Sequence, residues 1–169
     1  MLPLPDFSTC DLCDAHKNAD PGELRVWPGS RWRHYGKRQR FGGPVVTVRC
    51  FEDNSLVKAA VESPGAGRVL VVDGGESLRR ALLGGHLAAS AAAQGWAGLL
   101  IHGAVRDLAE LREAAVGLLA LGHCPMPTQR QGQGLRDVAL LIDGQAVRPG
   151  DWLYADEDGV LVAARCLHR

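Results

Sequence analysis

The sequence lacks three features that would each indicate a particular class of protein. It has no net charge at pH 7, because 19 Lys and Arg residues balance 19 Asp and Glu residues, so the chain as a whole is not drawn to nucleic acid or to an anionic membrane. Its longest apolar stretches, such as 87–93 and 97–101, are much shorter than the roughly 18 residues that a membrane span needs. Its five cysteines are scattered and odd in number, which argues against a disulfide framework.

A secretory signal is also missing from the start of the chain. Met1 to Ser8 contains no basic region followed by an apolar one, so we expect a cytoplasmic protein with reduced thiols and no membrane partner. With 169 residues, 46% hydrophobic and 22% charged, the composition is that of one ordinary globular domain.

Residues 1–43 are expected to form an N-terminal helix and loop arm of the same domain. A short helix is expected around Thr9 to His16, and Pro21 to Gly43 is expected to be mostly loop. This second part interleaves basic and aromatic residues, which is the composition of a nucleic-acid or partner-binding patch. Such side chains more often cover their own core or a neighbouring subunit, and we expect no direct nucleic-acid binding. The residues are Arg25, Arg31, Arg33, Lys37, Arg38 and Arg40, with Trp27, Trp32 and Tyr35.

Residues 44–169 show the alternation of strands and helices that is typical of an α/β domain. Val45 to Cys50 is strand-like, and Asn54 to Glu62 favours a helix. Arg68 to Val72 is almost continuously apolar, as expected for a strand covered on both faces. A helix through Leu87 to Gln94 and a second buried strand, Ala97 to Ile101, complete a βαβ unit.

The two strands of this unit run parallel, so the residues that follow them share one edge of the sheet. These are Asp73-Gly74-Gly75 and His102-Gly103-Ala104, and the carboxyl edge is where α/β sheets bind ligands. Asp107 to Ala115 predicts another helix, and Gly117 to Leu121 a further short strand. The remaining segments have the Asp-Gly and Pro-Gly punctuation of C-terminal hairpins: Val138 to Ile142, Gln145 to Val147, Trp152 to Ala155 and Val160 to Ala164.

Two familiar ligand motifs are incomplete. Gly74-Gly75 follows a strand, but the Gly-x-Gly-x-x-Gly pattern of a dinucleotide site is absent. Cys10 and Cys13 have the spacing of zinc ligands, yet no second cysteine pair follows and His16 alone does not complete a four-ligand site. A tight turn that needs glycine explains Gly74-Gly75, and buried or capping positions on a short helix explain Cys10 and Cys13.

A third group of residues fits a site for a 2-oxo acid. The loop Gly84-Gly85-His86-Leu87 precedes a helix whose free N–H groups could hold a carboxylate. Arg106 could bind the same carboxylate, and Asp107 offers a hard oxygen ligand for Mg²⁺ or Mn²⁺. Asp107 and Glu110 also match a capping box, in which Asp107 would only begin a helix. Both interpretations of Asp107 remain open from the residues alone.

The chain from about residue 41 to 163 resembles the RraA-like family. The resemblance is carried by phrases in order and at natural spacing: Phe41-Gly42-Gly43-Pro44-Val45-Val46-Thr47-Val48, Cys50-Phe51-Glu52-Asp53-Asn54, Val71-Val72-Asp73-Gly74-Gly75, Ala81-Leu82-Leu83-Gly84-Gly85, Gly95-Trp96-Ala97-Gly98, Gly103-Ala104-Val105-Arg106-Asp107 and Leu153-Tyr154-Ala155-Asp156-Glu157-Asp158-Gly159. The resemblance implies a compact swivelling β/β/α-type domain and a homotrimer with clefts between subunits.

The resemblance also implies an activity and roles for particular residues. In the family's aldolases, a loop matching Gly84 to Leu87 binds the pyruvate portion of the substrate, the arginine matching Arg106 contacts the substrate, and the aspartate matching Asp107 holds a divalent cation. We therefore expect a metal-dependent lyase that cleaves 4-hydroxy-4-methyl-2-oxoglutarate to pyruvate, with oxaloacetate decarboxylase side activity. Mg²⁺ or Mn²⁺ on Asp107 is the expected cofactor.

The chain departs from the family's aldolases at two places. They commonly carry an acidic residue at the position of Gly85, and relatives usually have glutamate where Leu135 follows Gly132-Gln133-Gly134. His86 is a candidate for the proton transfers of the missing acid, because a histidine near a helix N-terminus tends to stay neutral. An ordinary loop histidine is the alternative.

The alternative function is a non-enzymatic regulator that binds and inhibits ribonuclease E or another RNA-processing enzyme through its surface. Such regulators often lack the full Arg-Asp pair, so Arg106 and Asp107 favour the enzyme. Older labels in the family also name a menaquinone methyltransferase, but the sequence contains no glycine-rich loop for S-adenosylmethionine.

Overall fold

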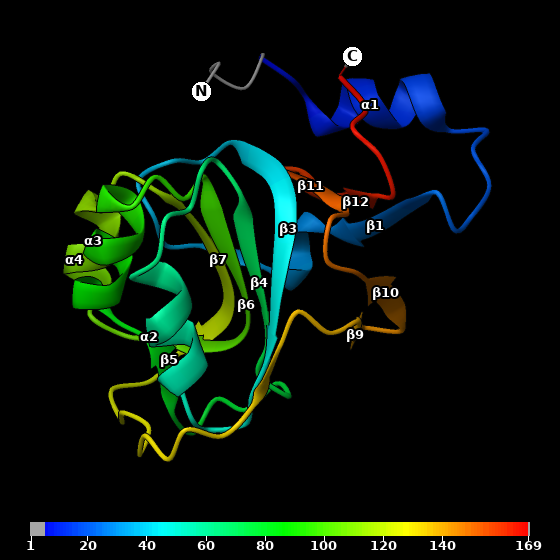
Figure 1. The fold of residues 1–169 in the computed structure, drawn as a ribbon. Helices are drawn as coiled ribbons and strands as arrows, with labels where there is room; N and C mark the ends of the chain where they lie inside the picture. The colour runs from blue at the N-terminus through cyan, green and yellow to red at the C-terminus, as the bar shows by residue number, and fades with distance from the viewer. Residues whose placement is uncertain (1–5, 169) are drawn as a thin grey trace.

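The computed structural model describes residues 6–168, so residues 1–5 of the expected arm and residue 169 lie outside the described part. Its largest element is a ten-stranded mixed sheet, and a two-stranded sheet lies beside it (Figure 1). The helices are α1 (Thr9–His16), α2 (Ser55–Val61), α3 (Gly85–Ala93) and α4 (Leu108–Glu113), with one 3-10 turn, η1 (Gly29–Arg31). The strands are β1 (Leu24–Pro28), β2 (Arg33–His34), β3 (Phe41–Arg49), β4 (Val69–Asp73), β5 (Ala81–Leu83), β6 (Gly98–Val105), β7 (Gly117–His123), β8 (Leu135–Arg136), β9 (Leu140–Ile142), β10 (Gln145–Val147), β11 (Trp152–Ala155) and β12 (Gly159–Ala163).

The centre of the large sheet is parallel and its flanks are antiparallel. The strand order is β1-β12-β11-β3-β4-β6-β7-β2; β3, β4, β6 and β7 run parallel, whereas β1, β11 and β12 pair antiparallel. Helices α2, α3 and α4 cover one face of the parallel strands, and β1, β11, β12 and the β9–β10 hairpin lie on the other side (Figure 1). Parallel pairing requires such crossover connections, and here each one contains a helix.

Two hydrophobic cores lie on opposite faces of the parallel strands. In β4, Leu70 and Val72 belong to the core under the helices, while Val69 and Val71 belong to the core facing the strands. All four side chains are fully buried, because successive residues of a strand point to opposite faces. The apolar run in the sequence therefore reflects a strand that is covered on both sides.

The mixed α/β architecture with a central βαβ unit and C-terminal hairpins is confirmed, with some differences in the boundaries. Strand β6 continues to Val105 instead of ending at Ile101, so His102 and Gly103 lie inside the strand and Arg106 follows its end directly. Helix α3 begins at Gly85 instead of Leu87. The short strand β5, which pairs with β6, was not expected.

The expectation that residues 21–43 are mostly loop was wrong. The segment contains β1, η1, β2 and the start of β3. Trp27, Trp32 and Tyr35 are buried, and Arg25 forms a buried ion pair with Asp151 at 3.0 Å. These aromatic rings cover the protein's own core, which is the interpretation favoured over a nucleic-acid patch.

The ring of Phe41 packs against one glycine on each of two neighbouring strands, β6 and β7. A Cβ atom added to Gly98 on β6 would lie 2.1 Å from a ring carbon of Phe41, and one added to Gly117 on β7 would lie 2.0 Å from another. Phe41 is itself 4% exposed. The ring therefore fills the space that side chains on these two strands would occupy.

Candidate functional site

A cleft of about 400 Å³ lies beside the N-terminus of α3. Its walls come from the end of β6, the start of α3, the residue preceding α2 and the loop between β7 and β8. The lining residues are Asn54, Ala81, Gly84, His86, Leu87, Arg106, Asp107, Pro127, Thr128 and Arg130. This volume suits a small polar ligand.

Arg106 and Asp107 form the turn between β6 and α4. The Arg106 N–H donates to the Leu83 carbonyl at 3.0 Å, which joins the turn to the end of β5. Asp107 has a left-handed backbone (φ 63°) and occupies the N-cap position of α4, but its side chain makes no capping bond there. Instead, its Oδ2 accepts a hydrogen bond from the Gly85 N–H at 3.0 Å. The capping-box interpretation is therefore not borne out, because Asp107 faces α3 and the cleft.

Both side chains approach Gly84 closely. A Cβ atom at Gly84 would lie 2.5 Å from Oδ2 of Asp107 and 3.3 Å from Cγ of Arg106. Glycine at this position thus lets a carboxylate and a guanidinium converge beside the first turn of α3. The first hydrogen bond of α3 runs from Ala88 N–H to Gly84 carbonyl at 3.0 Å, so the N–H groups of His86 and Leu87 have no acceptor within the helix.

The structure brings most of the predicted site residues together. Gly84, His86, Leu87, Arg106 and Asp107 all line the cleft. Gly85 is buried and does not line the cleft.

Glu110 occupies the space beside Gly85. An ideal Cβ at Gly85 would lie 1.9 Å from Oε2 of Glu110. Sequence reasoning treated Glu110 only as part of a capping box and missed this contact. A carboxylate therefore lies beside position 85 although the residue there is glycine.

Three cleft residues were also missed, and they form one hydrogen-bonded group. Asn54 donates through Nδ2 to the Leu82 carbonyl at 3.1 Å. Its Oδ1 accepts from the Thr128 hydroxyl at 2.8 Å and from Nε of Arg130 at 3.0 Å. Asn54 is 7% exposed. The buried amide thus fixes two side chains of the β7–β8 loop at the cleft.

Asp53 holds the next part of the same loop. Its Oδ2 accepts from the Gln131 N–H at 2.8 Å and from the Gln133 N–H at 3.1 Å, and Ser55 bonds to its Oδ1. Burial raises the pKa of the Asp53 carboxyl, but these hydrogen bonds outweigh it and lower the pKa to about 2. The charged carboxylate is the form that orders the loop.

The attachment of this loop should depend on pH. The pKa of Asp53 is about 2 in the folded protein, against an ordinary value of 3.8. The charged carboxylate therefore contributes its full stabilisation above pH 3.8, and this contribution is lost as the pH falls through the folded-state pKa of about 2. We expect the protection factors of the Gln131 and Gln133 amides, which correct for the intrinsic pH dependence of exchange, to fall over this window, as measured by NMR. In Asp53→Asn these two amides should have low protection factors at every pH; unchanged protection in this variant would contradict the assignment.

Within residues 6–168, the group suited to hold a metal by several side chains lies outside the cleft. It consists of Glu76, His102 and Asp143, whose ligand atoms lie within 4.8 Å of one another. Asp107 offers one carboxylate in the cleft, which fits Mg²⁺ because that ion keeps several waters and takes further oxygens from a substrate. Neither Cys10 nor Cys13 belongs to such a group in the described residues.

The fold and the cleft define a small mixed α/β protein with a polar cleft at the carboxyl edge of its parallel strands. The particular family follows from comparison with known proteins. A family model described as RraA-like (Aldolase/RraA) matches residues 9–162, and the chain belongs to the RraA-like family. The match confirms the resemblance of residues 41–163 and extends it to α1.

Individual relatives are similar over almost their whole length. A protein named "Putative 4-hydroxy-4-methyl-2-oxoglutarate aldolase" from Albidiferax ferrireducens is 59% identical over 168 residues, covering 95% of this chain and 96% of the relative. A solved structure described as the RNA-processing inhibitor RraA from Thermus thermophilis is 48% identical with a TM-score of 0.89, covering 95% of this chain and 94% of that chain. A structure described as an S-adenosylmethionine:2-dimethylmenaquinone methyltransferase from Geobacillus kaustophilus is 45% identical with a TM-score of 0.87, covering 95% and 97%. In the described part of the chain, every helix is too short or too polar to cross a bilayer.

Proposed function

We propose that the protein is a divalent-metal-dependent lyase that cleaves 4-hydroxy-4-methyl-2-oxoglutarate to pyruvate and decarboxylates oxaloacetate as a side activity. The observation that supports this most is the convergence of Arg106 and Asp107 on Gly84 at the N-terminus of α3. Relatives named as aldolases of this substrate, 59% and 54% identical, agree with the proposal.

The pyruvate portion of the substrate would bind at the start of α3. Its carboxylate accepts hydrogen bonds from the N–H groups of His86 and Leu87 and from the Arg106 guanidinium, since helix N-termini favour anions. Asp107 would hold Mg²⁺ or Mn²⁺, which stabilises the negative charge that develops on the 2-oxo oxygen. Arg106 adds a second positive charge at the same place.

The reaction balances with two proton transfers. The C4 hydroxyl loses a proton, the C3–C4 bond breaks and C4 becomes the carbonyl of one pyruvate. The electron pair passes to C3 as an enolate, which takes up a proton and becomes the second pyruvate. His86 is exposed on the cleft wall and Glu110 lies against Gly85; we propose that one of these two groups carries the protons.

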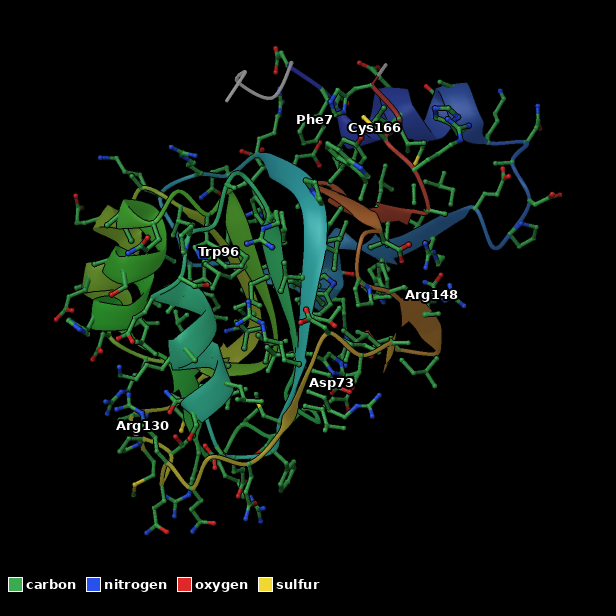
Figure 2. The ribbon with its side chains drawn as sticks, viewed as in Figure 1. Phe7, Asp73, Trp96, Arg130, Arg148 and Cys166 are labelled. Atoms are coloured by element: carbon green, nitrogen blue, oxygen red, sulfur yellow. The ribbon has the colours of Figure 1, made fainter. Side chains whose placement is uncertain are left out.

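Arg130 is suited to bind the second carboxylate of a dicarboxylic substrate. Its Nε donates to Oδ1 of Asn54, Arg130 lines the cleft, and its terminal nitrogens remain available for a ligand. Figure 2 shows Arg130 beside α2 and β5. We propose that Arg106 and Arg130 bind the two ends of the substrate, which would select dicarboxylic over monocarboxylic 2-oxo acids.

Arg130→Gln is expected to raise KM for 4-hydroxy-4-methyl-2-oxoglutarate about 10- to 100-fold, because the variant loses one hydrogen bond to a charged group of the substrate. Inhibition by pyruvate, a monocarboxylate, should remain the same. The matched control is Arg112→Gln, because Arg112 is exposed on α4 and does not line the cleft. If the two variants raise KM equally, Arg130 acts only through the overall charge of the protein and not by binding the second carboxylate of the substrate.

The function is tested by pyruvate release from 4-hydroxy-4-methyl-2-oxoglutarate and from oxaloacetate, with Mg²⁺ or Mn²⁺ and with EDTA. Turnover that requires the metal and exceeds the metal-only reaction supports the lyase. Turnover no faster than the metal alone, under every condition, would contradict it.

A second candidate function is favoured by the likeness to the structure described as the RNA-processing inhibitor RraA. We propose as the alternative a regulator that binds a ribonuclease E-type enzyme through its surface. A regulator should inhibit RNA cleavage by purified ribonuclease E and keep this effect in Arg106→Ala, which removes a cleft residue. The lyase should lose turnover in the same variant.

The oligomeric state that we propose is the homotrimer of the family. Exposed apolar side chains near the carboxyl edge would become covered by neighbouring subunits. They are Phe51, Leu78, Met126 and Leu135, each between 48% and 58% exposed.

A further inference from the structure

A second cluster of polar side chains lies apart from the cleft. Asp73 ends β4 and pairs in register with His102 on β6. Glu76 follows β4, and Asp143 lies in the turn between β9 and β10. None of the four residues lines the cleft, and Figure 2 shows Asp73 well separated from Arg130 in this view.

His102 lies at the centre of the cluster and is almost fully buried. The residue is 5% exposed. Its Nε2 is 3.2 Å from Oδ1 of Asp143 and 3.3 Å from Oε1 of Glu76. Its Nδ1 is buried, has no hydrogen-bond partner within residues 6–168, and faces Oδ1 of Asp73 at 3.7 Å. The imidazole thus has carboxylates on both sides.

Two of these distances fit the spacing of neighbouring ligands around a tetrahedral metal ion. For metal–ligand bonds of about 2.0–2.1 Å, neighbouring ligand atoms of a tetrahedron lie about 3.3 Å apart. The two distances from Nε2 match this spacing, and all three ligand atoms lie within 4.8 Å of one another. One imidazole with two carboxylates is a donor set that Zn²⁺ accepts, with water as the fourth ligand.

Asp73 completes the arrangement from the other side of the ring. Histidines that bind metals usually direct the second ring nitrogen to a carboxylate or carbonyl, which sets the tautomer. A proton on Nδ1 facing Asp73 would leave the lone pair of Nε2 free for the ion. We propose that Glu76, His102 and Asp143 form a Zn²⁺ site, with Asp73 as the residue that orients the imidazole.

Arg31 would compete with the ion for the carboxylates of Asp143 and Glu76. Its Nε donates to Oδ2 of Asp143 at 2.8 Å and its Nη2 to Oδ1 at 3.1 Å, and Nη2 also bonds to Glu76. The guanidinium therefore supplies the positive charge of the cluster. The Arg31 side chain is 38% exposed, so it can turn towards solvent when the ion binds.

The site would fasten the β9–β10 hairpin to the central sheet. These two strands pair only with each other in the described residues, and Leu140, Ile142 and Val147 anchor them in the core. An ion held by Asp143 and His102 adds a cross-link between the hairpin turn and β6. This role is structural and independent of the lyase reaction.

The test is Zn²⁺ binding by the full chain, measured by competition with a chromogenic chelator and by thermal unfolding. We expect one Zn²⁺ per chain at this site and a Tm raised by about 5 °C or more at a concentration far above Kd. Asp143→Asn keeps a residue that tolerates the turn's positive φ of 49° and should weaken binding about 100-fold. Arg31→Gln should tighten binding about three- to tenfold, because it removes the competing charge.

Three controls separate this site from other ligands in the chain. His123→Gln removes a histidine outside the cluster, Asp137→Asn removes a carboxylate outside both the cluster and the cleft, and Cys13→Ser removes a thiol. All three should bind Zn²⁺ like the wild type. Co²⁺ should give an intense tetrahedral visible spectrum without a sulfur charge-transfer band. Wild-type affinity in Asp143→Asn, or no saturable binding by the wild type, would overturn the proposal.

Discussion

Asp107→Asn is expected to lower kcat/KM for metal-dependent pyruvate release by about 10²- to 10³-fold, the usual effect of losing a charged group that acts on the transition state. Asparagine keeps an oxygen that can accept from the Gly85 N–H, as Oδ2 of Asp107 does at 3.0 Å. It also tolerates the left-handed backbone of this position. The substitution therefore removes the charge that would hold the cation and leaves the local structure in place.

The control for this variant is Asp137→Asn, because Asp137 is another aspartate with a positive φ (57°) and it does not line the cleft. It should retain full turnover. The Tm of both variants should stay within about 2 °C of the wild type, as for surface substitutions. Undiminished turnover in Asp107→Asn would show that the cation, if one is needed, is held elsewhere.

Gly117→Ala should be among the most destabilising single substitutions in the chain. Its Cβ would lie 2.0 Å from a ring carbon of Phe41, and β7 cannot retreat because it is paired with β6. We expect a loss of about 3 kcal/mol in the free energy of unfolding, at the upper end for overpacked cores. For a chain of this size the loss corresponds to a Tm lower by about 6–12 °C.

Phe41 provides the test of this explanation. If the clash causes the loss, Gly117→Ala should cost much less in a Phe41→Ala background, and a double-mutant cycle would show strong coupling. Gly22→Ala is the neutral control, because a Cβ there would meet nothing within 4 Å. Additive effects of the two substitutions would show that the clash with the ring is not the cause.

The part of the candidate site that lies close to one strand end could be predicted from the sequence. Gly84 to Leu87 begins the helix of the predicted βαβ unit and Arg106-Asp107 follows its second strand, so both were expected at the carboxyl edge of the sheet. The strand β5, which pairs with β6 beside them, was not expected. The direction of the Asp107 side chain could not be predicted. A capping aspartate and an aspartate facing the cleft have the same local sequence, and the choice depends on the contact with Gly85.

The other wall of the cleft depends on contacts between distant parts of the chain. Asn54, Thr128 and Arg130 meet through hydrogen bonds that span more than 70 positions, and no periodic pattern marks such contacts. The strands of the N-terminal segment were missed for a similar reason. Leu24 to Pro28 contains Arg25, whose burial depends on partners far along the chain, the Asp151 carboxylate and the Ala146 carbonyl.

The pairing of β1 with β12 has a consequence for how the protein is made. Leu24 pairs with Ala163 and Pro28 with Gly159, so the partner of β1 is synthesised long after β1 itself. Until then β1 presents unpaired backbone groups, which can recruit other chains. Synthesis therefore passes through a stage in which the parallel strands can already assemble while the backbone of β1 is still unpaired.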